Sequence, residues 1–168
     1  ATVYVEILPG DTVLSSQTLA KVCGAKDPAE FARFFILSDH RVHEQDARYA
    51  IQSLRETASK ALSPGINDPG TAIEVTVRLE RLLWDWMHAA PDDTDILYPR
   101  VFLSRLHTGT LLETAFIPIA RDGAAFVDVL SAVHRALRTL SQLCSDDARA
   151  TAERLLREVE GYAERGLR

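Results

Sequence analysis

Hydrophobic and polar residues alternate at the beginning of the chain, where Val3, Val5 and Ile7 are separated by single residues of other kinds. A period of two is typical of a half-buried β-strand, so we expect a strand over residues 2–8. Pro-Gly-Asp at 9–11 predicts a turn, because proline fixes φ and glycine accepts a positive φ. A second short strand at 19–22 would complete a β-hairpin.

The period changes to that of a helix from residue 44 onward. The first apolar stripe consists of Ala47, Ala50, Ile51, Leu54, Ala58, Ala61 and Leu62. Pro64-Gly65 ends this helix, and Asn67-Asp68-Pro69 begins the next with a cap and a first-position proline. On that second helix, to about residue 90, the predicted core face is Ala72, Val75, Leu79, Leu82, Leu83, Trp86 and Met87.

Shorter elements surround these two helices. Asp27-Pro28 predicts the start of a short helix that ends near Arg33. The apolar run at 34–38 is either a buried strand or the end of that helix. Residues 100–106 predict a strand beside the N-terminal hairpin, and 110–121 predict a helix.

Two long helices complete the chain. Apolar residues of the first alternate spacings of four and three, which is typical of a core or coiled-coil seam. That seam consists of Phe126, Leu130, Val133, Leu137, Leu140 and Cys144. The predicted fold is therefore α+β: a small β-rich part at 1–40 and a mainly helical part at 41–168, packed as a four- to five-helix bundle.

Charge and composition exclude several classes of protein. The net charge is −5, with scattered basic residues, which argues against nucleic-acid binding. A helix that crosses a bilayer needs about 20 mostly apolar residues in a row, and the sequence contains no such run. Cys23 and Cys144 have no metal-ligand spacing, and we expect two free thiols in a reducing compartment. Because the chain begins at Ala1 inside a predicted strand, we expect it to be a piece of a longer protein.

The sequence Ala-Leu-Ser-Pro-Gly-Ile-Asn-Asp-Pro-Gly-Thr-Ala at 61–72 is distinctive. Together with Arg41, Gln45, Asp46, Gln52 and Leu54 it resembles an uncharacterised bacterial membrane-protein family, domain of unknown function 2254. The chain departs from the family pattern at His40 and His43, which flank Arg41, and at Ile119-Ala120-Arg121, which lacks an arginine directly after the isoleucine.

The resemblance implies a multi-pass membrane protein whose soluble C-terminal region is this chain. The full-length protein would lie in the bacterial inner membrane, with this region on the cytoplasmic side and its own transmembrane segments as partners. The resemblance implies no activity.

Polar residues of the 63–71 loop and of the segment before the first long helix form the candidate ligand site. Its members are Arg41, Gln45, Asp46, Ser63, Asn67, Asp68 and Thr71. A rigid turn whose polar groups cap helices explains the loop equally well. Arg41 can pair with Asp46 or Asp68 in a structural salt bridge, or it can hold a ligand carboxylate or phosphate.

A metal site is not predicted. His40, His43 and Asp46 have a spacing of three, and zinc binds two histidines and a carboxylate. A fourth ligand is missing, and His40 precedes the helix. We therefore expect no metal and no cofactor.

The sequence favours a ligand-binding or regulatory domain that self-associates and senses a small molecule. An alternative is a hydrolase-type enzyme that uses a carboxylate of the Arg41, Asp46, Asn67 and Asp68 cluster as general base, so catalysis stays an open question. A third hypothesis is a purely structural oligomerisation domain with the 126–144 seam as its interface.

Overall fold

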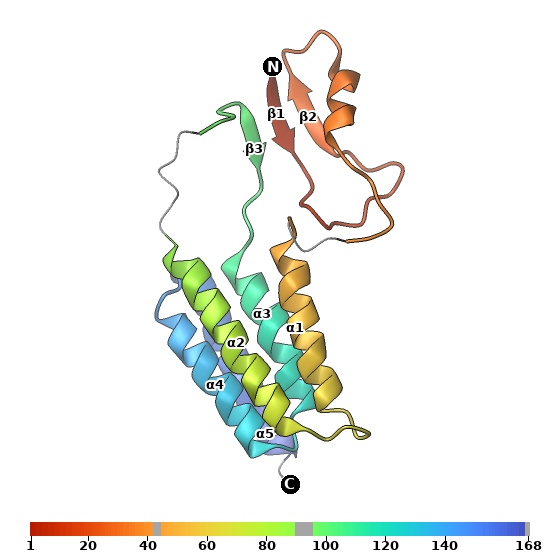
Figure 1. Ribbon diagram of the computed structural model, residues 1–168. Coiled ribbons are helices and arrows are strands. Elements are labelled where there is room, and N and C mark those ends of the chain that lie inside the picture. The colour runs from red at the N-terminus through yellow and green to blue at the C-terminus, as the bar shows by residue number, and fades with distance from the viewer. Residues whose placement is uncertain (42–44, 90–95, 167–168) are drawn as a thin grey trace. The chain divides into compact units, whose positions relative to one another are not determined.

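The computed structural model describes residues 1–41, 45–89 and 96–166 (Figure 1). Within these ranges the chain forms three strands, one 3₁₀ helix and five α-helices, which confirms the predicted α+β class. It divides into two compact units. The β unit comprises Ala1–Tyr49 and Asp93–Arg105, and the helical unit comprises Ala50–Asp92 and Leu106–Arg168.

A three-stranded sheet forms the centre of the β unit. Strand β1 (Thr2–Val5) lies between β2 (Ala20–Cys23), to which it is antiparallel, and β3 (Val101–Leu103), to which it is parallel. The ribbon in Figure 1 shows β1 and β2 as neighbours near the N-terminus. The strand predicted near 100–106 therefore does pair with the N-terminal hairpin.

The register of β1 places its apolar residues on one face. Val3 lies opposite Val22 on β2 and opposite Val101 on β3. Val3 is buried, whereas the next residue, Tyr4, is exposed on the other face. This is the alternation that the sequence predicts for a half-buried strand.

The segment after β2 confirms one prediction and corrects another. Helix η1 (Pro28–Phe34) begins as predicted, because the Asp27 side chain accepts a hydrogen bond from the backbone N–H of Ala29 at 2.9 Å. The possible buried strand at 34–38 is wrong: η1 ends at Phe34, and Ile36 and Leu37 are 93% and 69% exposed. Apolar residues are buried only where other residues pack against them, and the local sequence does not show whether such neighbours exist.

The remaining elements are helices. They are α1 (Ala47–Ala61), α2 (Pro69–His88), α3 (Thr108–Asp122), α4 (Val127–Ser141) and α5 (Asp146–Gly166). Helix α1 starts in the β unit and continues into the helical unit, since the division falls between Tyr49 and Ala50.

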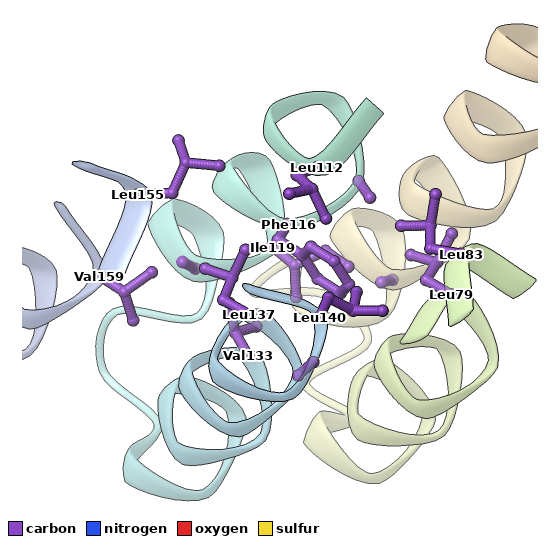
Figure 2. Close-up of a cluster of buried hydrophobic side chains, with 14 of the residues drawn as sticks. Leu79, Leu83, Leu112, Phe116, Ile119, Val133, Leu137, Leu140, Leu155 and Val159 are labelled. Carbon is purple, nitrogen blue, oxygen red and sulfur yellow. The ribbon is translucent and has the colours of Figure 1, made fainter. Parts of the chain in front are cut away.

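The hydrophobic core of the helical unit is built mainly by α2 to α5. Figure 2 shows how side chains from the four helices meet. Those labelled there are Leu79, Leu83, Leu112, Phe116, Ile119, Val133, Leu137, Leu140, Leu155 and Val159. All ten are almost completely buried, so this core supplies most of the apolar burial that stabilises the unit.

The seam on α4 is part of this core. Leu130, Val133, Leu137, Leu140 and Cys144 are each at most 5% exposed. A face that is buried within its own chain is not available to a second subunit. The hypothesis that this seam is an oligomer interface is therefore wrong, and the alternation of four and three reflects packing inside the bundle.

Some predicted inward-facing residues point to solvent. On α2 the buried stripe passes from Leu79 to Leu83, while Leu82 and Trp86 are about half exposed. Leu82 is three residues and Leu83 four residues after Leu79, and both spacings are compatible with one helix face. The packing of α2 against its neighbours buries Leu83 and leaves Leu82 exposed. Ala47, in the first turn of α1, is exposed as well.

Candidate functional site

The 63–71 loop caps α2. The side chain of Asp68 accepts the backbone N–H of Thr71 at 3.0 Å with one oxygen and the Thr71 hydroxyl at 2.6 Å with the other. Pro69 occupies the first helical position, where no N–H is needed. The hydroxyl and the backbone N–H of Thr71, followed by the Gly70 N–H, lower the pKa of the Asp68 carboxyl because they stabilise its ionised form.

The rest of the loop is closed by its own hydrogen bonds. The Ser63 carbonyl accepts the N–H groups of Ile66 and Asn67, and the Ser63 hydroxyl donates to the carbonyl of Lys60 at 2.7 Å. Asn67 has a φ of 51°, a left-handed conformation that asparagine tolerates better than most residues. Asn67 and Asp68 are both exposed. The geometry is that of a helix–helix turn in which Asp68 caps α2 and Ser63 bonds to the last turn of α1.

The segment before α1 contains a buried carboxylate. Asp46 has only 2% of its side chain exposed, and Arg41 donates to its Oδ2 from Nε at 2.9 Å and from Nη2 at 2.5 Å. Its Oδ1 accepts the backbone N–H of Tyr49 at 3.1 Å, so Asp46 caps the first turn of α1. The Arg41 guanidinium also lies 4.8 Å from the centre of the Tyr49 ring. The sequence allowed Arg41 to pair with Asp46 or with Asp68, and in the structure it pairs with Asp46.

A second arginine extends this cluster to the N-terminal turn. Arg48 donates from Nη2 to Asp11 Oδ1 at 2.6 Å and to the carbonyl of Pro9 at 3.1 Å. Its Nε lies 3.7 Å from Asp46 Oδ1. The turn at 9–11 is thereby joined to the start of α1. We call Asp11, Arg41, Asp46 and Arg48 the ion-pair network.

Gly10 makes this close approach possible. It adopts a φ of 84°, and a Cβ atom at this position would overlap the Asp46 carboxylate. Only glycine combines the positive φ with the absence of a side chain. The Pro-Gly-Asp sequence is therefore required both by the turn and by its contact with the network.

The charges of the network are balanced and shift the titration of Asp11. Burial raises the pKa of the Asp11 carboxyl. Hydrogen bonds from the Leu8 N–H and from Arg48, together with the positive charges of Arg48 and Arg41, outweigh this effect and hold the pKa below its ordinary value. Asp11 therefore remains an anion over a wide pH range and is a weak base.

The predicted site residues fall into two groups. Arg41, Gln45 and Asp46 precede α1, and Gln45 is exposed. Ser63, Asn67, Asp68 and Thr71 follow the same helix. The first group belongs to the β unit and the second to the helical unit.

Two members of the network, Asp11 and Arg48, are not among the site residues that the sequence predicts, and neither is Gly10. The sequence pattern indicates only a turn at Gly10 and Asp11 and gives no signal for Arg48. Arg48 is 37 positions from Asp11, a separation at which spacing carries no signal. The glycine before Asp11 was the available clue, because an obligatory positive φ beside a charged residue often marks a tight approach.

The metal hypothesis involves His43, which lies outside the described residues. His40 is exposed, and its backbone N–H donates to the Ser38 hydroxyl at 3.2 Å. Over the ranges 1–41, 45–89 and 96–166, no group of three His, Cys, Asp or Glu side chains is placed to hold a metal ion. Both cysteines are free, Cys23 at the surface and Cys144 in the core.

No helix in the described part of the chain has the length and apolar character needed to cross a membrane. The model of a family described as "Predicted membrane protein (DUF2254)" nevertheless matches residues 1–139. An uncharacterised protein of Mycobacterium bovis and its counterparts in two strains of Mycobacterium tuberculosis are each 30% identical over 138 residues. This alignment covers 77% of the present chain and 26% of each relative, so the chain spans about a quarter of their length. No solved structure matches.

Proposed function

Because the chain belongs to the DUF2254 family of predicted membrane proteins, we propose that it is an extramembrane regulatory domain that binds a small anionic ligand. The domain would lie on the cytoplasmic side of the bacterial inner membrane, attached to the membrane-spanning part of the same protein. The free Cys23 and Cys144 are compatible with a reducing compartment.

The ion-pair network is the observation that carries the proposal. The Arg41 side chain is 35% exposed and that of Arg48 26%, whereas the Asp46 carboxylate between them is buried. A guanidinium group binds carboxylates and phosphates through paired hydrogen bonds. A small ligand that carries such a group can reach the exposed sides of both arginines and compete with the aspartates.

The position of Asp46 gives such a ligand a structural effect. Asp46 caps α1, and α1 continues from the β unit into the helical unit. A ligand that draws Arg41 away from Asp46 changes the stability of the first turn of α1. Binding at the network would thus be coupled to the helix shared by both units, which is what a regulatory domain requires.

The alternative of a hydrolase has less support. A general base needs a carboxylate that is ionised, accessible and able to take a proton near neutral pH. Asp46 is buried against Arg41, and the pKa of Asp11 is lowered. Neither carboxylate is therefore suited to proton abstraction, and binding through the exposed sides of the two arginines has the better support.

A ligand screen tests the proposal. Phosphorylated and carboxylated metabolites, nucleotides and divalent metals would be added to the wild-type chain, and compounds that raise Tm would be measured by calorimetric titration. We expect an anionic compound to bind the wild type and the control Arg78→Gln, which removes an exposed arginine on α2. Arg41→Gln is expected to lose this binding.

Two results would contradict the proposal. The first is that no compound in the screen binds the wild type. The second is a hit whose affinity is the same for Arg41→Gln and wild type, since that ligand would not use the network.

A further inference from the structure

Strand β3 is apolar on both faces of the sheet although it is an edge strand. Val101, Phe102 and Leu103 are each about half exposed. The sheet order places β3 beside β1 on one side, and its other edge has no partner strand among the described residues. Strands that are apolar on both faces are typical of positions covered on both sides. The exposure of β3 therefore indicates a surface that another component covers.

Neighbouring side chains enlarge this apolar surface. The ring of Phe102 stacks on that of Tyr4 on β1, with centroids 5.1 Å apart and planes 14° from parallel. On the opposite face, Leu103 lies beside Val5. Just before the strand, Ile96 and Leu97 are about four-fifths exposed.

Two arginines lie within this apolar stretch, which directly follows Asp92, Asp93 and Asp95 in the sequence. Residues 96–105, which we call the apolar-basic segment, read Ile-Leu-Tyr-Pro-Arg-Val-Phe-Leu-Ser-Arg. They contain Arg100 and Arg105 and no acidic residue, in a chain whose net charge is −5. Exposed aliphatic and aromatic residues next to arginines are typical of segments that lie at a membrane surface.

We propose that the apolar-basic segment, together with Tyr4, docks on the surface of a lipid bilayer that contains anionic headgroups. Leu97, Tyr98 and Phe102 would enter the boundary between headgroups and acyl chains, while Arg100 and Arg105 contact lipid phosphates. This inference rests on the proposed function, because it requires the domain to lie beside the membrane that holds the rest of the protein. It adds the surface through which the domain meets the lipid.

Flotation with vesicles tests the proposal on the 168-residue chain. One set of vesicles contains phosphatidylcholine only, and the other contains phosphatidylcholine and phosphatidylglycerol in equal amounts. We expect the chain to float with the anionic vesicles and much less with the neutral ones. The double variant Arg100→Glu/Arg105→Glu is expected to weaken the binding at least about tenfold, while the control Arg78→Glu leaves it unchanged.

Apolar contacts are tested with matched half-exposed residues. Phe102 is 50% exposed on β3 and Leu82 is 51% exposed on α2, so Phe102→Ser and Leu82→Ser each remove a half-exposed apolar side chain. We expect Phe102→Ser to weaken flotation and Leu82→Ser to leave it unchanged. Leu97→Ser, outside the strand, is expected to do the same without altering the sheet, and circular dichroism checks that each variant is folded.

Three outcomes would overturn the proposal. They are no flotation with either kind of vesicle, equal weakening by Leu82→Ser, Phe102→Ser and Leu97→Ser, and self-association in light scattering that Leu97→Ser and Phe102→Ser abolish while vesicles do not bind. The last would show that a second copy covers β3. Vesicle binding does not depend on a hit in the ligand screen, so failure of one experiment is distinguishable from failure of the other.

Discussion

The backbone of Gly10 lies so close to the carboxylate of Asp46 that any side chain at position 10 would overlap it. The two residues are far apart in sequence and are brought together within the β unit by Arg48, which reaches the 9–11 turn, and by Arg41, which holds Asp46. The turn and the start of α1 thus form one structural element.

Gly10→Ala is expected to destabilise the chain by at least about 2–3 kcal/mol, because it adds overlap with Asp46 to the strain of a positive φ. Gly24 has a φ of 75°, and an added Cβ would meet only the Ala1 Cα, at an ordinary contact distance of 4.0 Å, so Gly24→Ala isolates the strain and should cost about 1–2 kcal/mol. Gly65→Ala meets nothing within 4 Å and should change stability by less than about 0.5 kcal/mol. Urea denaturation followed by circular dichroism measures all three. Equal costs for Gly10 and Gly24 would show that the contact with Asp46 is unimportant.

Asp46→Ala removes a buried carboxylate and a helix cap at once. We expect a loss of about 2–4 kcal/mol in the free energy of unfolding, since Arg41 loses its partner and the N–H of Tyr49 loses its acceptor. Glu74→Ala, which breaks the exposed pair with Arg78 on α2, should cost only about 0.5 kcal/mol. The same denaturation experiment compares the two. Similar losses for both variants would mean that burial adds nothing to the Arg41–Asp46 pair.

The cap at Asp68 should make stability depend on pH. The pKa of Asp68 is lowered in the folded chain, so its ionised form favours folding. This contribution is complete above the unfolded pKa of about 3.9 and is lost as the pH falls through the lowered folded value. Asp68→Asn keeps an acceptor for the Thr71 N–H but cannot titrate. The Tm difference between wild type and Asp68→Asn should therefore shrink on acidification, and a difference that is constant down to about pH 2 would contradict the pKa direction.

The two cysteines should react very differently. Cys23 is exposed, whereas Cys144 is buried and donates to the carbonyl of Leu140. Burial raises the pKa of the Cys144 thiol, and the positive charge of Arg149 opposes this only in part, so less reactive thiolate is present. A thiol reagent added to the native chain should modify Cys23 quickly and Cys144 only after denaturation. Cys23→Ser is the control, and it should leave no fast-reacting thiol.

Local signals account for the parts of the fold that the sequence predicts correctly. Asp27-Pro28 and Asp68-Pro69 each begin a helix, because a capping side chain and a first-position proline act within three residues. The seam on α4 is buried as predicted, since its period alone identifies the core face.

Long-range packing explains what the sequence does not predict. Spacing from Leu79 does not show whether Leu82 or Leu83 is buried. Ile36 is apolar, but no neighbouring residue in the described part of the chain buries it, and it is 93% exposed. Within the candidate site, Arg41 and Asp46 are five residues apart and their pairing was among the predicted alternatives. The contribution of Asp11 depends on a contact that spans 37 positions, which no local pattern encodes.

The ion-pair network contains two positive and two negative side chains, so its formal charges cancel. A substitution that removes an arginine leaves a carboxylate without its full countercharge, and one that removes an aspartate leaves an arginine without its partner. We therefore expect these four positions to change as a set within the family: loss of Arg48 should be accompanied by loss of Asp11 more often than it occurs alone.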